Sequence, residues 1–169
     1  MKIVKLLFWL WKKVNLPNWL RWALVSAVNQ KFLVGAAVVI LNEQHEVLLF
    51  NHTYRLSYPW GLPTGWLQRG EDPARAIERE VFEESQLVVR VTGLLSVSAA
   101  QGVPRLDVVY VGCPVGGSFR PSAEVSAAAF FAPDNLPPIL ADQRAMIAQA
   151  LEQVGQSQNQ VNLSVSLPL

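Results

Sequence analysis

The chain has 169 residues, of which 51% are hydrophobic and 16% are charged. This length suits one globular domain with a modest extension, and the hydrophobic content excludes a disordered chain. The single cysteine, Cys113, excludes an intrachain disulfide and favours a cytoplasmic location. The only two histidines, His45 and His52, exclude a zinc site built on Cys/His spacing.

The charge is divided unevenly along the chain. Residues 1–32 carry six Lys and Arg side chains and no acid, so their net charge is +6, whereas the remainder carries −5. Four of the six tryptophans lie in the same first 32 residues. This asymmetry predicts an anionic surface as the partner of the basic segment and a cation-dependent site in the acidic body.

The basic segment is predicted to form two helices. Residues 2–13 have the spacing of an amphipathic helix with a narrow basic face, and Pro17 prevents its continuation. A second apolar helix is expected over residues 18–29. The uncharged run of residues 6–11 is too short for a signal peptide or a transmembrane span.

Three interpretations of this segment remain open. The two helices can pack on the body or form a homodimer contact. They can instead lie on an anionic membrane surface, as basic and Trp-rich helices do. Nucleic-acid binding is a third alternative, but six dispersed charges support it poorly, so we expect no nucleic-acid partner.

The body begins with a predicted hairpin and a loop. Residues 32–41 are rich in Val, Ile and Ala and predict a buried strand, and residues 47–50 predict the strand that returns beside it. Residues 51–67 contain two prolines and two glycines and predict an irregular loop.

A helix is predicted next, over residues 72–85. Pro73 falls in its first turn, where a missing N–H costs nothing. Ala74, Ile77 and Val81 form an apolar stripe at helical spacing. This stripe is expected to pack the helix against the body.

The second half predicts more strands and one more helix. Strands are expected over residues 88–98, 106–115 and 124–131, and a helix over residues 140–154. The Gln-, Asn- and Ser-rich residues from 155 onward are expected to be a flexible tail. Strands on both sides of a central helix predict an α/β sandwich with a mixed sheet.

One acidic cluster carries the chemistry. Glu80, Glu83 and Glu84 are three or four residues apart, so they lie on one helix face, where like charges repel. Carboxylate oxygens are hard ligands that suit Mg²⁺ or Mn²⁺, and a bound divalent cation points to phosphate chemistry. The alternative is a solvated helix face, but the glycine loop, Glu71 and Arg79 at fixed offsets argue against it.

This segment resembles the Nudix box, which the chain matches from Gly65 to Leu87. Five residues separate Gly65 from Glu71, and seven more separate Glu71 from the pair Arg79-Glu80. Glu83 and Glu84 follow on the same helix. The resemblance extends over residues 32–154 and implies a Nudix α/β/α sandwich that hydrolyses a nucleoside diphosphate linked to another moiety. The implied organisation is residues 1–31 as a helical extension, 32–154 as the Nudix domain and 155–169 as the tail.

The resemblance also implies roles for the box residues. Glu80, Glu83 and Glu84 are implied as metal ligands, and Glu83, Glu84 and Arg79 are counted as catalytic. Arg79 also supports the ligands, as does Glu71. Two departures stand out. Gln86 replaces the usual final glycine, a substitution that a left-handed helix end tolerates at a cost of roughly 1 kcal/mol. Thr64 occupies a position where the family commonly has glycine.

The general base is either a ligand glutamate or a later one. Glu124 is the candidate from the second class, because it is the only acid between Asp107 and Asp134; a plain surface glutamate is its alternative. Tyr54 and Arg55 precede the box and are candidates to stack on a base and to bind phosphate, together with Gly65 at the box itself.

Two other functions remain open beside hydrolysis of a soluble nucleotide. One is a non-catalytic nucleotide sensor that keeps the fold, which Gln86 and Thr64 favour weakly. The other is a membrane-peripheral hydrolase of a lipid-linked diphosphate, which the basic residues 1–31 favour.

Overall fold

The computed structural model describes residues 17–165, with side chains described for residues 17–157. The chain divides into two compact units, Met1–Phe32 and Leu33–Leu169. The helix predicted over residues 2–13 lies outside the described residues. The second predicted helix is present as α2, Asn18–Val28, and Pro17 is its N-cap residue. Among the described residues, no helix combines the length and apolar character that a membrane span requires.

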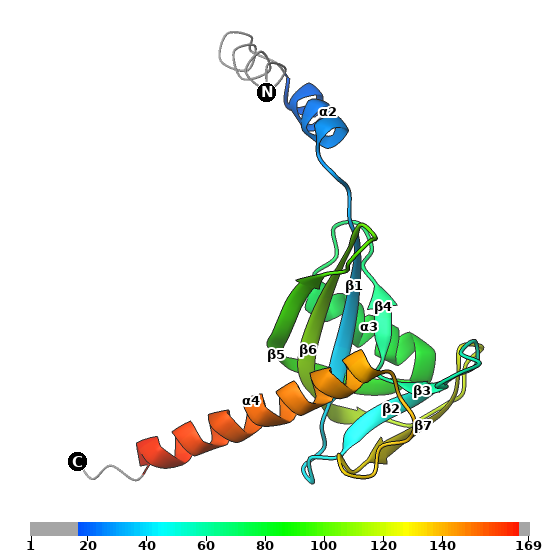
Figure 1. The fold of residues 1–169 in the computed structure, drawn as a ribbon, viewed down its shortest axis with the longest axis vertical. Helices are drawn as coiled ribbons and strands as arrows, with labels where there is room; N and C mark the ends of the chain where they lie inside the picture. The colour runs from blue at the N-terminus through cyan, green and yellow to red at the C-terminus, as the bar shows by residue number, and fades with distance from the viewer. Residues whose placement is uncertain (1–16, 166–169) are drawn as a thin grey trace. The chain divides into compact units, whose positions relative to one another are not determined.

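The second unit contains two sheets. The four-stranded sheet has the order β4-β1-β6-β5 and the three-stranded sheet has the order β3-β2-β7. Only the central β1–β6 pair is parallel; the remaining pairs are antiparallel. Figure 1 shows the two sheets side by side. Their strands are β1 Leu33–Ile40, β2 Val47–His52, β3 Trp60–Gly61, β4 Thr64–Trp66, β5 Leu87–Ala99, β6 Arg105–Gly117 and β7 Val125–Phe131.

The predicted hairpin of the first two strands is wrong. β1 and β2 belong to different sheets, and the backbone bridge between this part of the chain and β2 joins Leu41, which follows β1, to Val47. The reason is that β1 is central, with β6 on one edge and β4 on the other, so neither edge is left for β2. The predicted loop over residues 51–67 is also partly wrong, because it contains β3 and β4.

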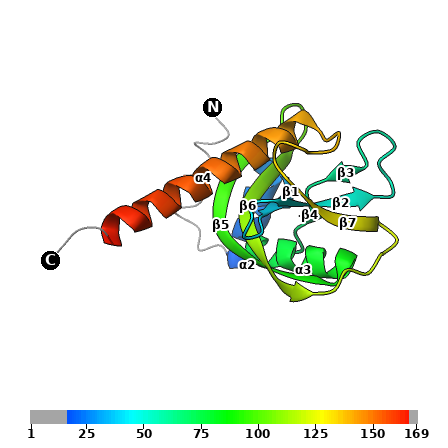
Figure 2. The same cartoon turned by 90° about the horizontal axis from the view of Figure 1, so that it is seen from below.

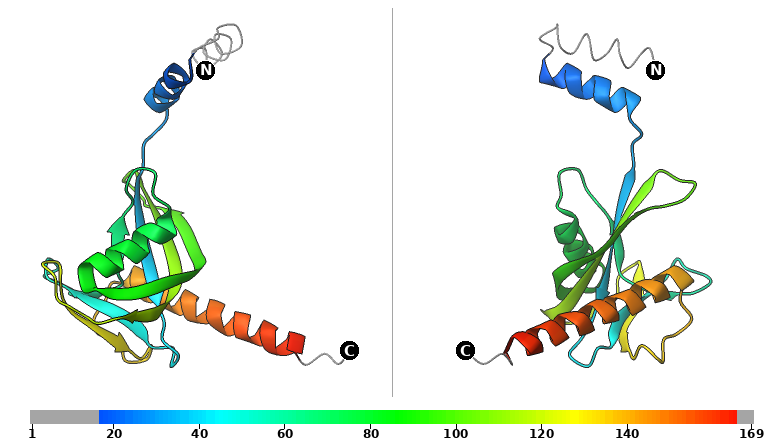
Figure 3. Two further views of the ribbon diagram at one scale, coloured as in Figure 1. Left: turned by 180° about the vertical axis from the view of Figure 1, so that it is seen from behind. Right: turned by 60° about the vertical axis from the view of Figure 1, so that its left-hand side comes forward.

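Two helices cover opposite sides of the four-stranded sheet, as Figures 2 and 3 show. They are α3, Pro73–Ser85, and α4, Ala141–Val165. Alternate residues of β1 face opposite sides: Val39 joins the core that contains Ile147 of α4, whereas Val38 joins the core that contains Ile77 of α3. The α/β/α sandwich with a mixed sheet is therefore confirmed.

The ends of α3 follow from its sequence. Asp72 is the N-cap, and its carboxylate accepts hydrogen bonds from the backbone N–H groups of Ala74 and Arg75. Gln86 ends the helix in the left-handed conformation with φ of 60°, as predicted for the position where the family has glycine. The buried apolar stripe includes Ala76 in place of the predicted Ala74.

Helix α4 is longer than predicted. The structure places residues 155–165 in this helix, where we had expected an irregular tail. Side-chain hydrogen bonds anchor its middle, where Gln149 and Gln153 donate to the backbone carbonyls of Leu95 and Leu94 on β5. Both glutamines lie within the predicted helix of residues 140–154, and they attach this part of α4 to the edge strand of the sheet.

Candidate functional site

The acidic helix α3 lies directly against the short strand β4, and Gly65 permits this contact. A Cβ at Gly65 would overlap the side chain of Glu80, lying 2.6 Å from its Cδ and 2.8 Å from its Cβ. The glycine thus has a steric function, since any side chain would separate the strand from the helix. The contact places Glu80 beside the β4 backbone at one wall of a pocket.

Arg79 joins four carboxylate oxygens. Its Nε and Nη2 donate to the two oxygens of Glu71 at 2.8 and 3.0 Å. Its Nη1 donates to Glu80 and to Glu83, both at 2.9 Å. The hydrogen bond from Arg79 lowers the pKa of Glu71. Arg79 therefore offsets the repulsion between the helix carboxylates and fixes two of them in position.

Glu71 also supports the loop, as predicted. Its Oε2 accepts a hydrogen bond from the backbone N–H of Gln68 at 3.1 Å. Glu71 lies outside α3, whose N-cap is Asp72, so it acts as a bridge between the glycine loop and Arg79.

Glu84 is the carboxylate with the most unusual environment. Its Oε2 is buried and has no hydrogen-bond partner among the described residues. Burial, together with the charges of Glu124 and Glu80, raises the pKa of Glu84 to about 7. The Arg55 guanidinium acts in the opposite direction. A buried carboxylate that faces two others is a position for a bound cation or a proton.

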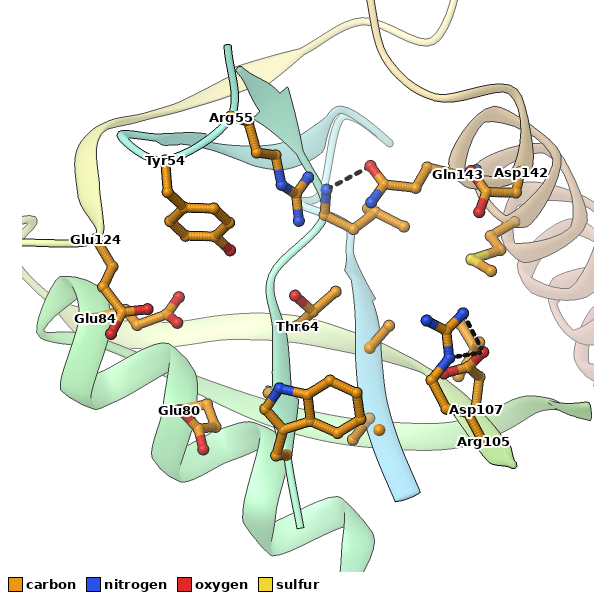
Figure 4. A pocket seen from close by; sticks show the side chains of 18 residues that line it. Tyr54, Arg55, Thr64, Glu80, Glu84, Arg105, Asp107, Glu124, Asp142 and Gln143 are labelled. Atoms are coloured by element: carbon orange, nitrogen blue, oxygen red, sulfur yellow. Dashed lines mark hydrogen bonds and ion pairs between the residues drawn. The ribbon is translucent and has the colours of Figure 1, made fainter. Parts of the chain in front are cut away.

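These groups share one pocket of about 500 Å³ (Figure 4). Glu80, Glu84 and Glu124 lie along one side, with Tyr54 and Arg55 beside them. The Nη1 of Arg55 is buried and has no hydrogen-bond partner among the described residues, so the pocket holds an unsatisfied cation donor next to its carboxylates. Thr64 lies between these groups and the opposite end of the pocket (Figure 4), and Gly65 also lines the pocket.

The comparisons with known proteins agree on one family. The model of the NUDIX domain matches residues 31–151, which is most of the chain. The chain belongs to the NUDIX family. A similar curated protein is the 8-oxo-dGDP phosphatase NUDT18 of Mus musculus, 36% identical over 90 residues, which are 53% of this chain but only 28% of that protein. The chain thus spans little more than a quarter of this Nudix relative.

Two further Nudix proteins match over more of their length. The ADP-ribose pyrophosphatase of Methanocaldococcus jannaschii is 29% identical over 115 residues, covering 64% of this chain and 67% of that protein. A crystal structure of UDP-X diphosphatase is 22% identical, with a TM-score of 0.65 and coverage of 90% of this chain and 80% of that one. At that identity the structural likeness supports the Nudix fold alone.

The structure brings six of the predicted Nudix site residues together in this pocket, whereas Glu71, Arg79 and Glu83 do not line it. Tyr54, Arg55, Gly65, Glu80, Glu84 and Glu124 all line the pocket. Glu83 does not, because its side chain is 57% exposed and turns to Arg79. Within residues 17–165, no three acidic, histidine or cysteine side chains already converge as a metal cluster.

The residues present nevertheless fit a divalent cation. The partnerless oxygen of Glu84 is a ready anionic ligand, and Glu80 lies on the same wall of the pocket. Glu80 and Glu83 each use one carboxylate oxygen to accept a hydrogen bond from Arg79. The second oxygen of each carboxylate is available to a cation. Hard oxygen donors of this kind suit Mg²⁺ or Mn²⁺.

The opposite end of the pocket was not predicted. It is lined by Trp66, by the ion pair of Arg105 with Asp107, and by Gln143 at the start of α4. Gly35 leaves a gap there, since a Cβ at this position would lie 3.1 Å from Asp107 Oδ1 and 3.6 Å from the Trp66 ring. No short motif identifies this end of the pocket. The one feature of the sequence that could have indicated it is the charged pair Arg105 and Asp107 at the start of an otherwise apolar strand.

We expect Arg79→Gln to lower activity by about 10- to 100-fold, because residues that orient metal ligands typically contribute this much. Glu80 and Glu83 would lose their common donor and repel each other. The measurement is kcat/KM together with calorimetric affinity for Mg²⁺, which a merely structural role would leave unchanged.

The matched control is Arg75→Gln on the same helix. The side chain of Arg75 is 80% exposed and forms an ion pair with Glu78. It should retain the activity of the parent protein. Equal losses in the two variants would contradict the positioning role of Arg79.

Proposed function

We propose that this Nudix protein is a Mg²⁺- or Mn²⁺-dependent hydrolase that cleaves the pyrophosphate link of a nucleoside diphosphate joined to another moiety. The observation that carries the proposal is the pocket that the carboxylates Glu80 and Glu84 line together with Arg55, whose buried Nη1 has no hydrogen-bond partner among the described residues. A diphosphate with bound cations satisfies both kinds of charge at once.

The residues have distinct roles in this proposal. Glu80, Glu83 and Glu84 hold the cation, which when bound neutralises phosphate charge and acidifies water. Arg55 donates to a phosphate oxygen, and its position over Tyr54, at 5.7 Å from the ring centroid, holds the guanidinium in place. The proton of the attacking water passes to a carboxylate, either Glu124 or a ligand glutamate. Gly65 keeps the strand close to Glu80.

The activities for which the relatives are named support the substrate class. They describe an 8-oxo-dGDP phosphatase, an ADP-ribose pyrophosphatase and a UDP-X diphosphatase. All three substrates contain a nucleoside diphosphate. In this chain, Trp66 offers a ring on which a base or sugar can stack, and Asp107 offers an acceptor beside it.

The test is a product assay on a panel of such compounds with Mg²⁺ or Mn²⁺. The panel contains ADP-ribose, nucleotide sugars, NADH, dinucleoside polyphosphates, nucleoside triphosphates and oxidised dGDP. We expect metal-dependent release of a phosphorylated nucleoside from one class. Tight nucleotide binding without turnover across the panel would favour the non-catalytic sensor, although a pure binder has no need for these adjacent carboxylates. A cytoplasmic location and a homodimer remain proposals.

Glu124→Gln tests the assignment of the base. If Glu124 accepts the proton, we expect kcat to fall by about 10²- to 10⁴-fold near neutral pH. The loss should shrink as pH rises, because hydroxide can attack without a base. A kcat equal to that of the parent protein at every pH would move this role to a ligand glutamate.

A further inference from the structure

The helix α2 exposes an aromatic face. Trp19 is 70% exposed and Trp22 is 71% exposed, and none of the residues of α2 is buried. The two tryptophans are three positions apart in the sequence, so they lie on the same side of the helix, together with the small residues Ala23 and Ser26. Two large rings on one helix face are costly to leave in water, which indicates that something covers them.

The net charge of residues 1–32 indicates what kind of surface binds this aromatic face. Residues 1–32 contain five lysines and one arginine without any acid, and they contain two more tryptophans in addition to those of α2. A second copy of this segment also carries a net charge of +6, so the two copies would repel each other. An anionic surface that also accepts aromatic rings fits both properties, and the interface of a bilayer containing acidic lipids is such a surface.

We propose that α2 binds the surface of an anionic lipid bilayer, with Trp19 and Trp22 inserted at the level of the headgroups. Tryptophan is favoured at that depth because its ring is apolar and its N–H remains near water. The 11 residues of α2 are about 16 Å long, far short of the roughly 30 Å of a hydrocarbon core, so this helix lies along the surface. The basic side chains contribute attraction that salt screens.

The experiment is co-sedimentation of the full chain with vesicles. One set contains equal parts of phosphatidylcholine and phosphatidylglycerol, and the other contains phosphatidylcholine alone. We expect binding to the first set, little binding to the second, and weaker binding at high salt. Trp19→Ala/Trp22→Ala should weaken binding to the anionic vesicles by about tenfold or more, given the apolar area that two rings bury.

The control is Leu94→Ala/Val97→Ala, which removes two half-exposed apolar side chains from β5 in the other unit. It should bind vesicles like the parent protein. Equal binding of the parent and the tryptophan variant overturns the proposal, as does equal binding to both vesicle sets. If neither binds vesicles but light scattering shows a dimer that only the parent forms, a second copy covers the face and the proposal is wrong.

This inference stands apart from the proposed hydrolase. Hydrolysis of a soluble substrate should be the same in the parent protein and the tryptophan variant, since α2 contributes no residue to the pocket. A protein that binds vesicles but hydrolyses nothing on the panel would contradict the proposed function alone.

Discussion

Glu84→Gln is expected to lower kcat/KM by about 10²- to 10⁴-fold, the range for a carboxylate that assists proton transfer or holds a reacting group. The substitution keeps the shape of the side chain and removes the negative charge. Glu84 has a buried oxygen without a partner among the described residues, so its charge is available to a cation or to water. Steady-state kinetics on the substrate found by the panel measure the loss.

The control is Glu152→Gln, an exposed glutamate on α4. It should leave kcat/KM unchanged. Full activity in Glu84→Gln would remove this residue from the site and with it the main support for a cation there.

The same substitution should make the metal-free protein more stable at alkaline pH. Burial raises the pKa of Glu84 to about 7 from its ordinary value of 4.5, so the native state holds the proton more tightly than the unfolded state. Ionisation therefore destabilises the parent protein as pH rises from 4.5, and the effect is complete above 7. With chelator present at pH 8, Glu84→Gln should have a Tm higher by a few degrees.

Well below pH 4.5, the difference in Tm should disappear, because the carboxyl is then protonated in both states. A variant that is less stable than the parent at pH 8 would show that the charged carboxylate is satisfied in the native protein. Such opposite effects on activity and stability are typical of functional residues.

The local parts of this fold could be predicted from the sequence. The spacing of apolar residues, the Pro73 position and the acidic face define α3, because a helix is built from contacts three and four residues apart. The pairing of strands could not be predicted in the same way. β1 pairs with β6 some seventy residues later, and that pairing removes the edge on which a hairpin with β2 would form.

The candidate site shows the same contrast between local features, which the sequence predicts, and long-range contacts, which it does not. Its carboxylates were predictable because a motif of fixed spacing lies on one helix. Its opposite end depends on long-range packing: Asp107 reaches the pocket because β6 pairs with β1, with Gly35 opposite Asp107 in the register. Gln143 reaches it because its Oε1 accepts a hydrogen bond from the backbone N–H of Leu62 at 3.0 Å. No sequence spacing encodes either contact.

Gly65→Ala is expected to impair both activity and stability. The new Cβ would meet the Cγ, Cδ and Cβ of Glu80, and the Cβ of Glu80 is fixed by the backbone of α3, so a rotamer change cannot remove the whole clash. β4 and α3 must then separate at the wall of the pocket. Overpacking of this kind costs about 1–3 kcal/mol, and we expect a Tm lower by several degrees together with a kcat/KM reduced by about tenfold or more.

Two further variants make this prediction specific. Gly116→Ala on β6 meets no atom within 4 Å and should behave like the parent protein. Gly65→Ala/Glu80→Ala removes the Cγ and Cδ of Glu80, so it should recover part of the lost Tm without recovering activity. Differential scanning calorimetry and the nucleotide assay measure the two effects. A Gly65→Ala protein as stable and as active as Gly116→Ala would show that the strand does not need its close approach to the acidic helix.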